Sequence, residues 1–160
     1  MEQKKNMALV AHDHHKPELI DWVLQNYETL VHHSLVCTGT TGTLIEKALQ
    51  KKRTECDAEK AANTPLPSVT KLKSGPLGGD QQLGALITEG RIDVLIFFWD
   101  PMQPQPHDVD VKALLRIAVV YNIAVASSRA TADFLISSPL MNTPYRTTLM
   151  DYSTYINRSI

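Results

Sequence analysis

Four segments of the sequence concentrate side chains that can move protons or bind anions. Each follows a short apolar run; they are residues 12–16 (His-Asp-His-His-Lys), 38–42 (Thr-Gly-Thr-Thr-Gly), 74–80 (Ser-Gly-Pro-Leu-Gly-Gly-Asp) and 100–110, which begins and ends with aspartate. Small residues that open a helix expose backbone N–H groups, and these suit a phosphate dianion. Carboxylates near histidines suit proton transfer. The residue types therefore indicate an enzyme that acts on a small phosphate ester.

Acids in the third and fourth segments are the candidates for a catalytic base. Asp80 follows two glycines at the expected start of a helix, where the helix dipole lowers a carboxyl pKa and weakens the base. A dry pocket or a neighbouring acid would offset that effect, and Asp100, Asp108 or Asp110 could be the neighbour. His107 lies among prolines and acids, so we expect it in a site rather than in an apolar core.

The 38–42 segment can bind phosphate or can simply cap a helix. The second glycine-rich segment, 74–79, favours phosphate, and Lys16 could add a positive charge. Neither segment has the lysine that closes a Walker loop or the spacing of a dinucleotide fingerprint. The sequence therefore predicts the phosphate of a small metabolite rather than that of a nucleotide.

His12, His14 and His15 beside Asp13 raise the alternative of a metal site, since divalent ions favour such clusters. However, successive side chains of an extended segment point to opposite sides, and no His-Glu-x-x-His spacing occurs. We therefore expect no metal at this segment.

The elements that must position these segments alternate along the chain. Short apolar runs and amphipathic stretches predict α/β architecture: a single three-layer domain over residues 1–160 with a mostly parallel, doubly wound central sheet. Strands are expected at 7–11, 35–37, about 69–73, 94–99 and 124–126, and helices after Pro17, at about 43–51, after Gly79, at about 109–121 and at about 131–137. The polar segments then follow the carboxyl ends of strands, where open α/β sheets bind ligands.

Three regions depart from this alternation. Residues 50–67 are polar and charged, and we expect a surface insertion there. The three prolines of 100–110 should hold that loop extended and stiff. Residues 145–160 are expected to form a short strand and a terminal helix.

Composition narrows the classes of protein. A net charge of −1 and a pI near 6.6 disfavour a nucleic-acid partner. The longest apolar run, 94–99, is too short to cross a membrane, and no signal peptide is evident, so we expect a cytoplasmic protein. Cys37 and Cys56 form neither a disulfide framework nor a zinc pattern, and both are expected to be free thiols.

Taken in order, these motifs resemble the methylglyoxal synthase family over nearly the whole chain. The segments that carry the resemblance are 10–14 with Lys16, 38–42, 74–76 with 78–82, 97–101, 106–108 and 110–112. The resemblance implies a lyase that converts dihydroxyacetone phosphate to methylglyoxal and inorganic phosphate through an enediol. It also implies a cytoplasmic homohexamer that uses no metal or organic cofactor and is inhibited allosterically by inorganic phosphate.

The resemblance also implies roles for individual residues. Asp80 would be the catalytic base, His107 and Asp110 would assist proton movement, and Asp100 would line the site. His12 would reach the substrate, and the phosphate would be held by Lys16, Thr38, Gly39, Thr40, Thr41, Ser74 and Gly75. In the reaction so implied, we expect neutral His107 to donate a hydrogen bond to the developing enolate oxygen.

Two departures from the family and two rival functions complete the expectations. The 50–67 segment is longer than the family's usual connection, and Arg158, which resembles an arginine that pairs with an acid of a neighbouring subunit, lies in a shifted context.

One rival function is a regulatory module such as the effector-binding part of carbamoyl phosphate synthetase, but Asp80 and Asp110 would only repel an anion there. The other is a phosphate-ester hydrolase or isomerase on the same scaffold.

Overall fold

A five-stranded parallel sheet forms the centre of the computed structural model, which describes residues 1–55 and 65–158. The strands are β1 (Asn6–Ala11), β2 (Ser34–Cys37), β3 (Ser68–Lys71), β4 (Val94–Phe98) and β5 (Ala124–Ala126), in the spatial order β3-β2-β1-β4-β5. Every neighbouring pair is parallel, with Leu9 of β1 opposite Cys37 of β2 and Ile96 of β4. The predicted strands and their parallel arrangement are confirmed.

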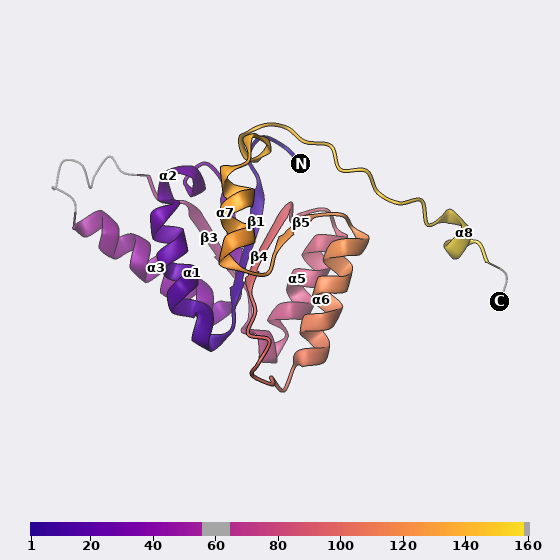
Figure 1. Cartoon of the computed structure of the whole chain (residues 1–160), viewed down its shortest axis with the longest axis horizontal. Coiled ribbons are helices and arrows are strands. Elements are labelled where there is room, and N and C mark those ends of the chain that lie inside the picture. The colour runs from indigo at the N-terminus through magenta and orange to yellow at the C-terminus, as the bar shows by residue number, and fades with distance from the viewer. Residues whose placement is uncertain (56–64, 159–160) are drawn as a thin grey trace.

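Helices cover both faces of this sheet. The longer helices are α1 (Lys16–Gln25), α3 (Gly39–Thr54), α5 (Gly79–Thr88), α6 (Asp108–Val120) and α7 (Arg129–Ser137), and the short α2 (Tyr27–Leu30) follows α1. Figure 1 shows α1, α3 and α7 on one side of the sheet and α5 and α6 on the other. This arrangement confirms the predicted three-layer, doubly wound α/β class.

Alternation along β1 supplies both cores. Met7 and Leu9 pack with α1, α3 and α7, whereas Ala8 and Val10 pack with α5 and α6. All five residues of β4 are buried, as the unbroken apolar run predicted. Burying each large apolar side chain contributes about 1.5–3 kcal/mol, so these two strands anchor the sheet. Their carboxyl ends are therefore well fixed.

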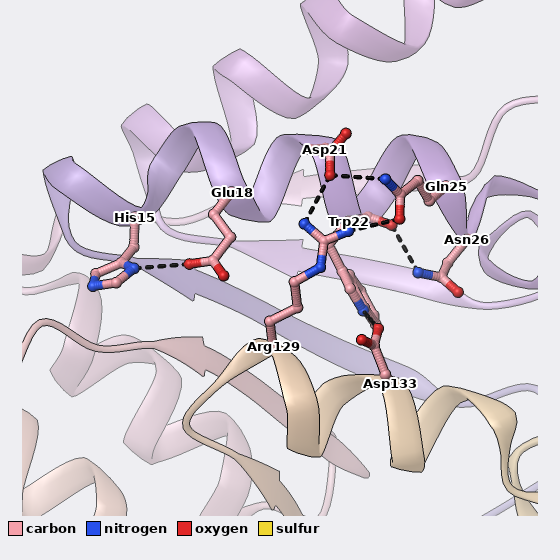
Figure 2. A network of polar contacts seen from close by, with 8 residues as sticks. All are labelled: His15, Glu18, Asp21, Trp22, Gln25, Asn26, Arg129 and Asp133. Carbon is pink, nitrogen blue, oxygen red and sulfur yellow. Dashed lines mark hydrogen bonds and ion pairs between the residues drawn. The ribbon is translucent and has the colours of Figure 1, made fainter.

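Trp22 joins α1 to α7 and was not singled out by the sequence. Its side chain is fully buried, and its indole N–H donates to Asp133 at 2.9 Å. Arg129 at the start of α7 donates to Asp21 and to Gln25 of α1 (Figure 2). These contacts fix α1, whose first residue lies beside the candidate site.

Helix α3 begins earlier and ends later than the sequence suggested. The prediction that 38–42 forms a turn before a helix at 43 is wrong, because α3 begins at Gly39 and Gly42 N–H donates to Thr38 O at 2.8 Å. The same helix ends at Thr54, so residues 50–54 of the predicted surface insertion are helical. The rest of the predicted insertion includes residues 56–64, which lie outside the described residues.

The C-terminal segment also differs from expectation. No strand occurs between residues 145 and 158; only the short helix α8 (Ser153–Ile156) forms there. Figure 1 shows this segment leaving the amino-terminal end of the sheet and carrying α8 away from the three layers. A strand needs a hydrogen-bonded neighbour, and this path runs alongside neither sheet edge.

Two further findings concern the described residues. Cys37 is a free, buried thiol, and burial raises its pKa to about 12; Cys56 lies outside the described residues. Within the part of the chain that the structure describes, none of the helices has the length and apolar character needed to cross a membrane.

Candidate active site

The candidate site lies where the strand order reverses between β1 and β4. The chain moves from β1 to β2 and β3 on one side and then returns to β4 on the other, and such a switch point leaves a crevice beyond the strand ends. A cavity of about 90 Å³ opens here. Its walls include predicted site residues from all four polar segments: His12, Lys16, Thr38, Thr40, Ser74, Gly75, Asp80 and His107.

Asp80 and His107 form a buried pair in this cavity. His107 Nδ1 lies 2.9 Å from Asp80 Oδ2, and the two side chains are 11% and 2% exposed, respectively. Burial raises the pKa of Asp80 above its ordinary value of 3.8; His107 opposes that rise, and the negative charge of Asp110 adds to it. The sequence analysis required a dry pocket to offset the effect of the helix dipole on a base at this position. The burial of Asp80 provides such a pocket.

His12 has a defined tautomer. The backbone N–H of Asp100 donates to His12 Nδ1 at 3.2 Å, so Nδ1 is an acceptor and the proton of the neutral ring lies on Nε2. Burial, followed by the charge of His107, lowers the pKa of His12 below 6.5. Nε2 is buried and has no hydrogen-bond partner among the described residues. His12 is therefore a neutral donor without an acceptor, in the wall of the cavity.

Groups suited to binding a phosphate also line the cavity. Thr38 is the N-cap residue of α3 and is buried, and Lys16 Nζ lies 3.1 Å from Thr40 Oγ1. Lys16 also donates to Asp13 at 2.5 Å, and this hydrogen bond lowers the pKa of Asp13. The first N–H groups of a helix lack intrahelical partners, so α3 adds amide donors to the ammonium and hydroxyl groups.

Four predicted site residues do not line the cavity. Gly39 borders an adjoining hollow with Thr40 and Ser74, and Thr41 is buried and accepts a hydrogen bond from Thr38 Oγ1. Asp110 acts on Asp80 only through its charge. The fourth residue is Asp100, described next.

Asp100 shapes the loop that follows β4. Its Oδ1 accepts from the N–H groups of Met102 and Gln103 at 2.9 and 3.2 Å, and these bonds lower the pKa of Asp100. Oδ2 lies 3.5 Å from His14 Nδ1. The loop consequently bends at 101–103 and turns again before α6, so the prediction of a wholly extended arm is wrong. The prolines could not predict this bend, because a side chain creates it.

The cavity also includes residues that the sequence did not indicate. Gln105, Pro76 and Phe97 line it, and the half-buried Gln105 side chain makes no hydrogen bond with residues 1–55 or 65–158. No motif marks a lone glutamine in a proline-rich loop. Of the described residues, no three or more His, Cys, Asp or Glu side chains are grouped so as to hold a metal ion.

A larger cavity of about 230 Å³ lies at the opposite end of the sheet, beneath the start of the C-terminal segment. Its lining is mostly apolar, and its charged side chain, Lys5, is buried with Nζ donating to the backbone oxygens of Glu2 and Thr143. The described residues around this cavity provide no acid–base pair. The smaller cavity, which holds the Asp80–His107 pair, is therefore the candidate active site.

Comparisons with known proteins agree with this geometry. Residues 18–127 match the family model described as "MGS-like domain". The chain is 57% identical over 160 residues to a methylglyoxal synthase of Maridesulfovibrio salexigens, with 100% of both chains covered, and 51% identical over 156 residues to one of Coxiella burnetii RSA 493, with 98% of each covered.

A solved structure extends the comparison to three dimensions. The crystal structure of methylglyoxal synthase from Elizabethkingia anophelis NUHP1 matches with a TM-score of 0.85 at 47% sequence identity and covers 100% of this chain and 95% of that one. Fold, site segments and full-length identity therefore agree, and this chain belongs to the methylglyoxal synthase family.

Proposed function

We propose that this chain converts dihydroxyacetone phosphate to methylglyoxal and inorganic phosphate, the reaction implied by the name its relatives carry. The observation that supports this most is the buried Asp80–His107 pair, which shares one cavity with Lys16 and Thr40. One small substrate could therefore contact the base and the phosphate-binding groups at the same time.

Asp80 starts the reaction as the base. It removes a proton from the hydroxymethyl carbon of the substrate, and the C–H electron pair becomes the C=C bond of an enediolate. Burial strengthens the carboxylate as a base, because the raised pKa brings it closer to that of a weak carbon acid. His107 occupies Oδ2, and Oδ1 has no hydrogen-bond partner among the described residues.

His12 donates to the carbonyl oxygen that becomes negative in this step. The sequence favoured neutral His107 for this role, but its Nδ1 faces the Asp80 carboxylate, which can only accept. The proton of a neutral His107 then lies on Nδ1 and leaves Nε2 as an acceptor. His12 has the opposite tautomer, so its Nε2–H is the donor that the enediolate needs.

His107 and Asp110 then assist the proton movements. His107 Nε2, as an acceptor, can take the hydroxyl proton of the enediol while Nδ1 stays bonded to Asp80. Asp110 lies in the first turn of α6 and keeps the pKa of Asp80 high through its charge.

Phosphate departs in the second step. The C–O bond breaks with its electron pair going to phosphate, and the enol that remains tautomerises to methylglyoxal. This elimination requires the breaking bond to lie perpendicular to the plane of the enediol. We propose that Lys16, Thr38, Thr40, Ser74 and Gly75 hold the phosphate in that orientation, with the Thr41 amide at the start of α3; the Gly39 amide donates to Lys73 O instead.

Product identity tests the proposal. Incubation with dihydroxyacetone phosphate should release methylglyoxal and inorganic phosphate in equal amounts. Glyceraldehyde 3-phosphate would indicate an isomerase, dihydroxyacetone with phosphate would indicate a hydrolase, and binding without any product would indicate a regulatory module. Any of these three results would overturn the proposed function.

None of the proposed steps uses a metal or organic cofactor. We therefore expect exhaustive treatment with EDTA to leave the rate of methylglyoxal formation unchanged. A rate that falls and is restored by a divalent cation would contradict this and would favour metal-dependent phosphate chemistry.

The family resemblance also supports a homohexamer in the cytoplasm, with inorganic phosphate as an allosteric inhibitor. The C-terminal segment exposes apolar side chains such as Leu149, Met150 and Ile156, which fits contact with another subunit. Within one chain, Arg158 lies over the Tyr155 ring and donates to its hydroxyl. Light scattering of the purified protein tests the assembly, and a monomer would exclude it.

A further inference from the structure

The two glycine-rich segments of the candidate site are joined through the backbone of one residue, Lys73. Its carbonyl accepts from Gly39 N–H, at the start of α3, at 3.1 Å. Its own N–H donates to the side-chain Oε1 of Gln82 in α5 at 2.8 Å. The next residues, Ser74 and Gly75, line the cavity. The position of Lys73 thus sets where the second segment lies relative to the first.

The backbone around Lys73 is closely packed, which makes this position sensitive. A Cβ at Gly79 would lie only 2.2 Å from Lys73 O, and one at Gly39 would lie 3.2 Å from Ser74 N. Gly79 N–H also donates to Ser74 O at 2.9 Å. A shift of Lys73 would therefore move the phosphate-binding groups next to the starts of both α3 and α5.

Gln82 is the side chain that holds the N–H of Lys73. Helical side chains tilt towards the N-terminus of their helix, so a residue in the first turn of α5 can reach back to the preceding loop. Its neighbour Gln81 is also exposed, has the same side chain and makes no hydrogen bond with the described residues. Of the two adjacent glutamines, the structure therefore gives a hydrogen bond to Lys73 N–H only to Gln82.

We propose that Gln82 is a positioning residue that sets the spacing of the two phosphate-binding segments through Lys73 N–H. Gln82 touches neither the substrate nor the Asp80–His107 pair in this role. It determines how tightly the phosphate group is held, whereas Asp80 determines the rate of proton removal. The inference rests on the proposed function and names a further residue for that site.

Paired variants at the two glutamines test the proposal. Gln82→Met keeps the length of the side chain but removes the acceptor, and Gln81→Met is the matched control. A lost hydrogen bond of this kind changes an equilibrium by about two- to tenfold. We expect Gln82→Met to raise KM for dihydroxyacetone phosphate and Kd for inorganic phosphate by about that factor, and Gln81→Met to change neither.

A second pair separates the hydrogen bond from charge. Gln82→Glu keeps an oxygen acceptor for Lys73 N–H but adds a negative charge, and Gln81→Glu adds the charge alone. We expect these two variants to show the same KM and Kd. A Gln82→Glu variant with a much higher Kd than Gln81→Glu would overturn the proposal.

Phosphate titration by calorimetry counts binding sites as well as affinity, so a loss of folded protein is distinguished from a loss of affinity. A Gln82→Met variant with fewer sites but unchanged Kd has only lost stability, and this result would overturn the proposal. So would values equal to those of Gln81→Met. If the unmodified chain bound phosphate without forming methylglyoxal, the proposed function would fail while the Kd comparison still decided the role of Gln82.

Discussion

At the scale of single residues, the fold sets the pairing and the protonation of the candidate catalytic groups. Asp80 and His107 could be selected because an acid after two glycines and a histidine among prolines have few structural roles. Their hydrogen bond joins residues 27 positions apart, and the burial that raises the pKa of Asp80 is a property of the folded chain. The His12 tautomer likewise depends on a backbone N–H from the loop after β4.

The first prediction concerns His12. His12→Phe keeps an aromatic ring beside Phe97 but removes the Nε2–H donor. Removing one donor to a developing oxyanion lowers kcat by about 10²–10³-fold, and we expect a loss of that order. Steady-state kinetics with dihydroxyacetone phosphate measure it, and the Kd of inorganic phosphate should change little. Full activity in His12→Phe would show that another group donates to the developing enolate oxygen.

At the scale of elements, the alternation of apolar and amphipathic segments predicted the strands and most helices. It misplaced the start of α3, because threonine and glycine in 38–42 are as typical of a turn as of a helix N-terminus. The difference matters for function. A helix that begins at Gly39 directs its first amides toward the space beyond the strands, whereas a turn would not align them.

The second prediction concerns the close approach of the 3₁₀ turn Gly75–Leu77 to the Asp80–His107 pair. A Cβ at Gly75 would lie 3.0 Å from His107 Cε1 and 3.1 Å from Asp80 Oδ2. Gly75→Ala should therefore displace the pair, and because misplacement of about 1 Å costs about 10²-fold, we expect kcat to fall by up to that factor.

Gly84→Ala provides the control for this variant. Gly84 lies within α5, and a Cβ there meets no other atom within 4 Å. Alanine in place of glycine inside a helix stabilises a protein by about 0.5–1 kcal/mol, so thermal stability should rise while kcat stays unchanged. Equal kcat values for Gly75→Ala and Gly84→Ala would contradict the packing of Gly75 against the pair.

At the scale of the whole molecule, one sheet gathers the four polar segments, and we propose that the chain is a single domain. The sequence could not predict the course of residues 143–158, because an extended segment without a partner strand has no periodicity to identify it. Its exposed apolar side chains fit the proposed contact with another subunit.

The third prediction is the pH dependence of stability. Burial lowers the pKa values of His12 and His33 below 6.5, so the unfolded chain binds more protons than the folded chain just below that pH. Stability should therefore fall as the pH drops below 6.5. Burial raises the pKa of Asp80, so the folded chain holds the extra proton above pH 3.8, and this group destabilises the fold as pH rises through its folded pKa.

Melting temperatures measured from about pH 4 to pH 8 check both signs. His33→Gln should weaken the loss of stability on the acid side, whereas His32→Gln, at an exposed position, should not. Asp80→Asn should raise the melting temperature at neutral pH, because the neutral amide removes the cost of burying a charged carboxylate. Identical acid profiles for the two histidine variants would refute the burial argument.

The central claim is that the buried Asp80 carboxylate removes the proton from a substrate whose phosphate is held by other groups. The most direct measurement compares Asp80→Asn with the unmodified chain for the rate of methylglyoxal formation and the Kd of inorganic phosphate. Because a base contributes to the transition state and not to ground-state binding, we expect kcat to fall by about 10³-fold or more while Kd stays nearly constant. Turnover retained in Asp80→Asn would contradict the account.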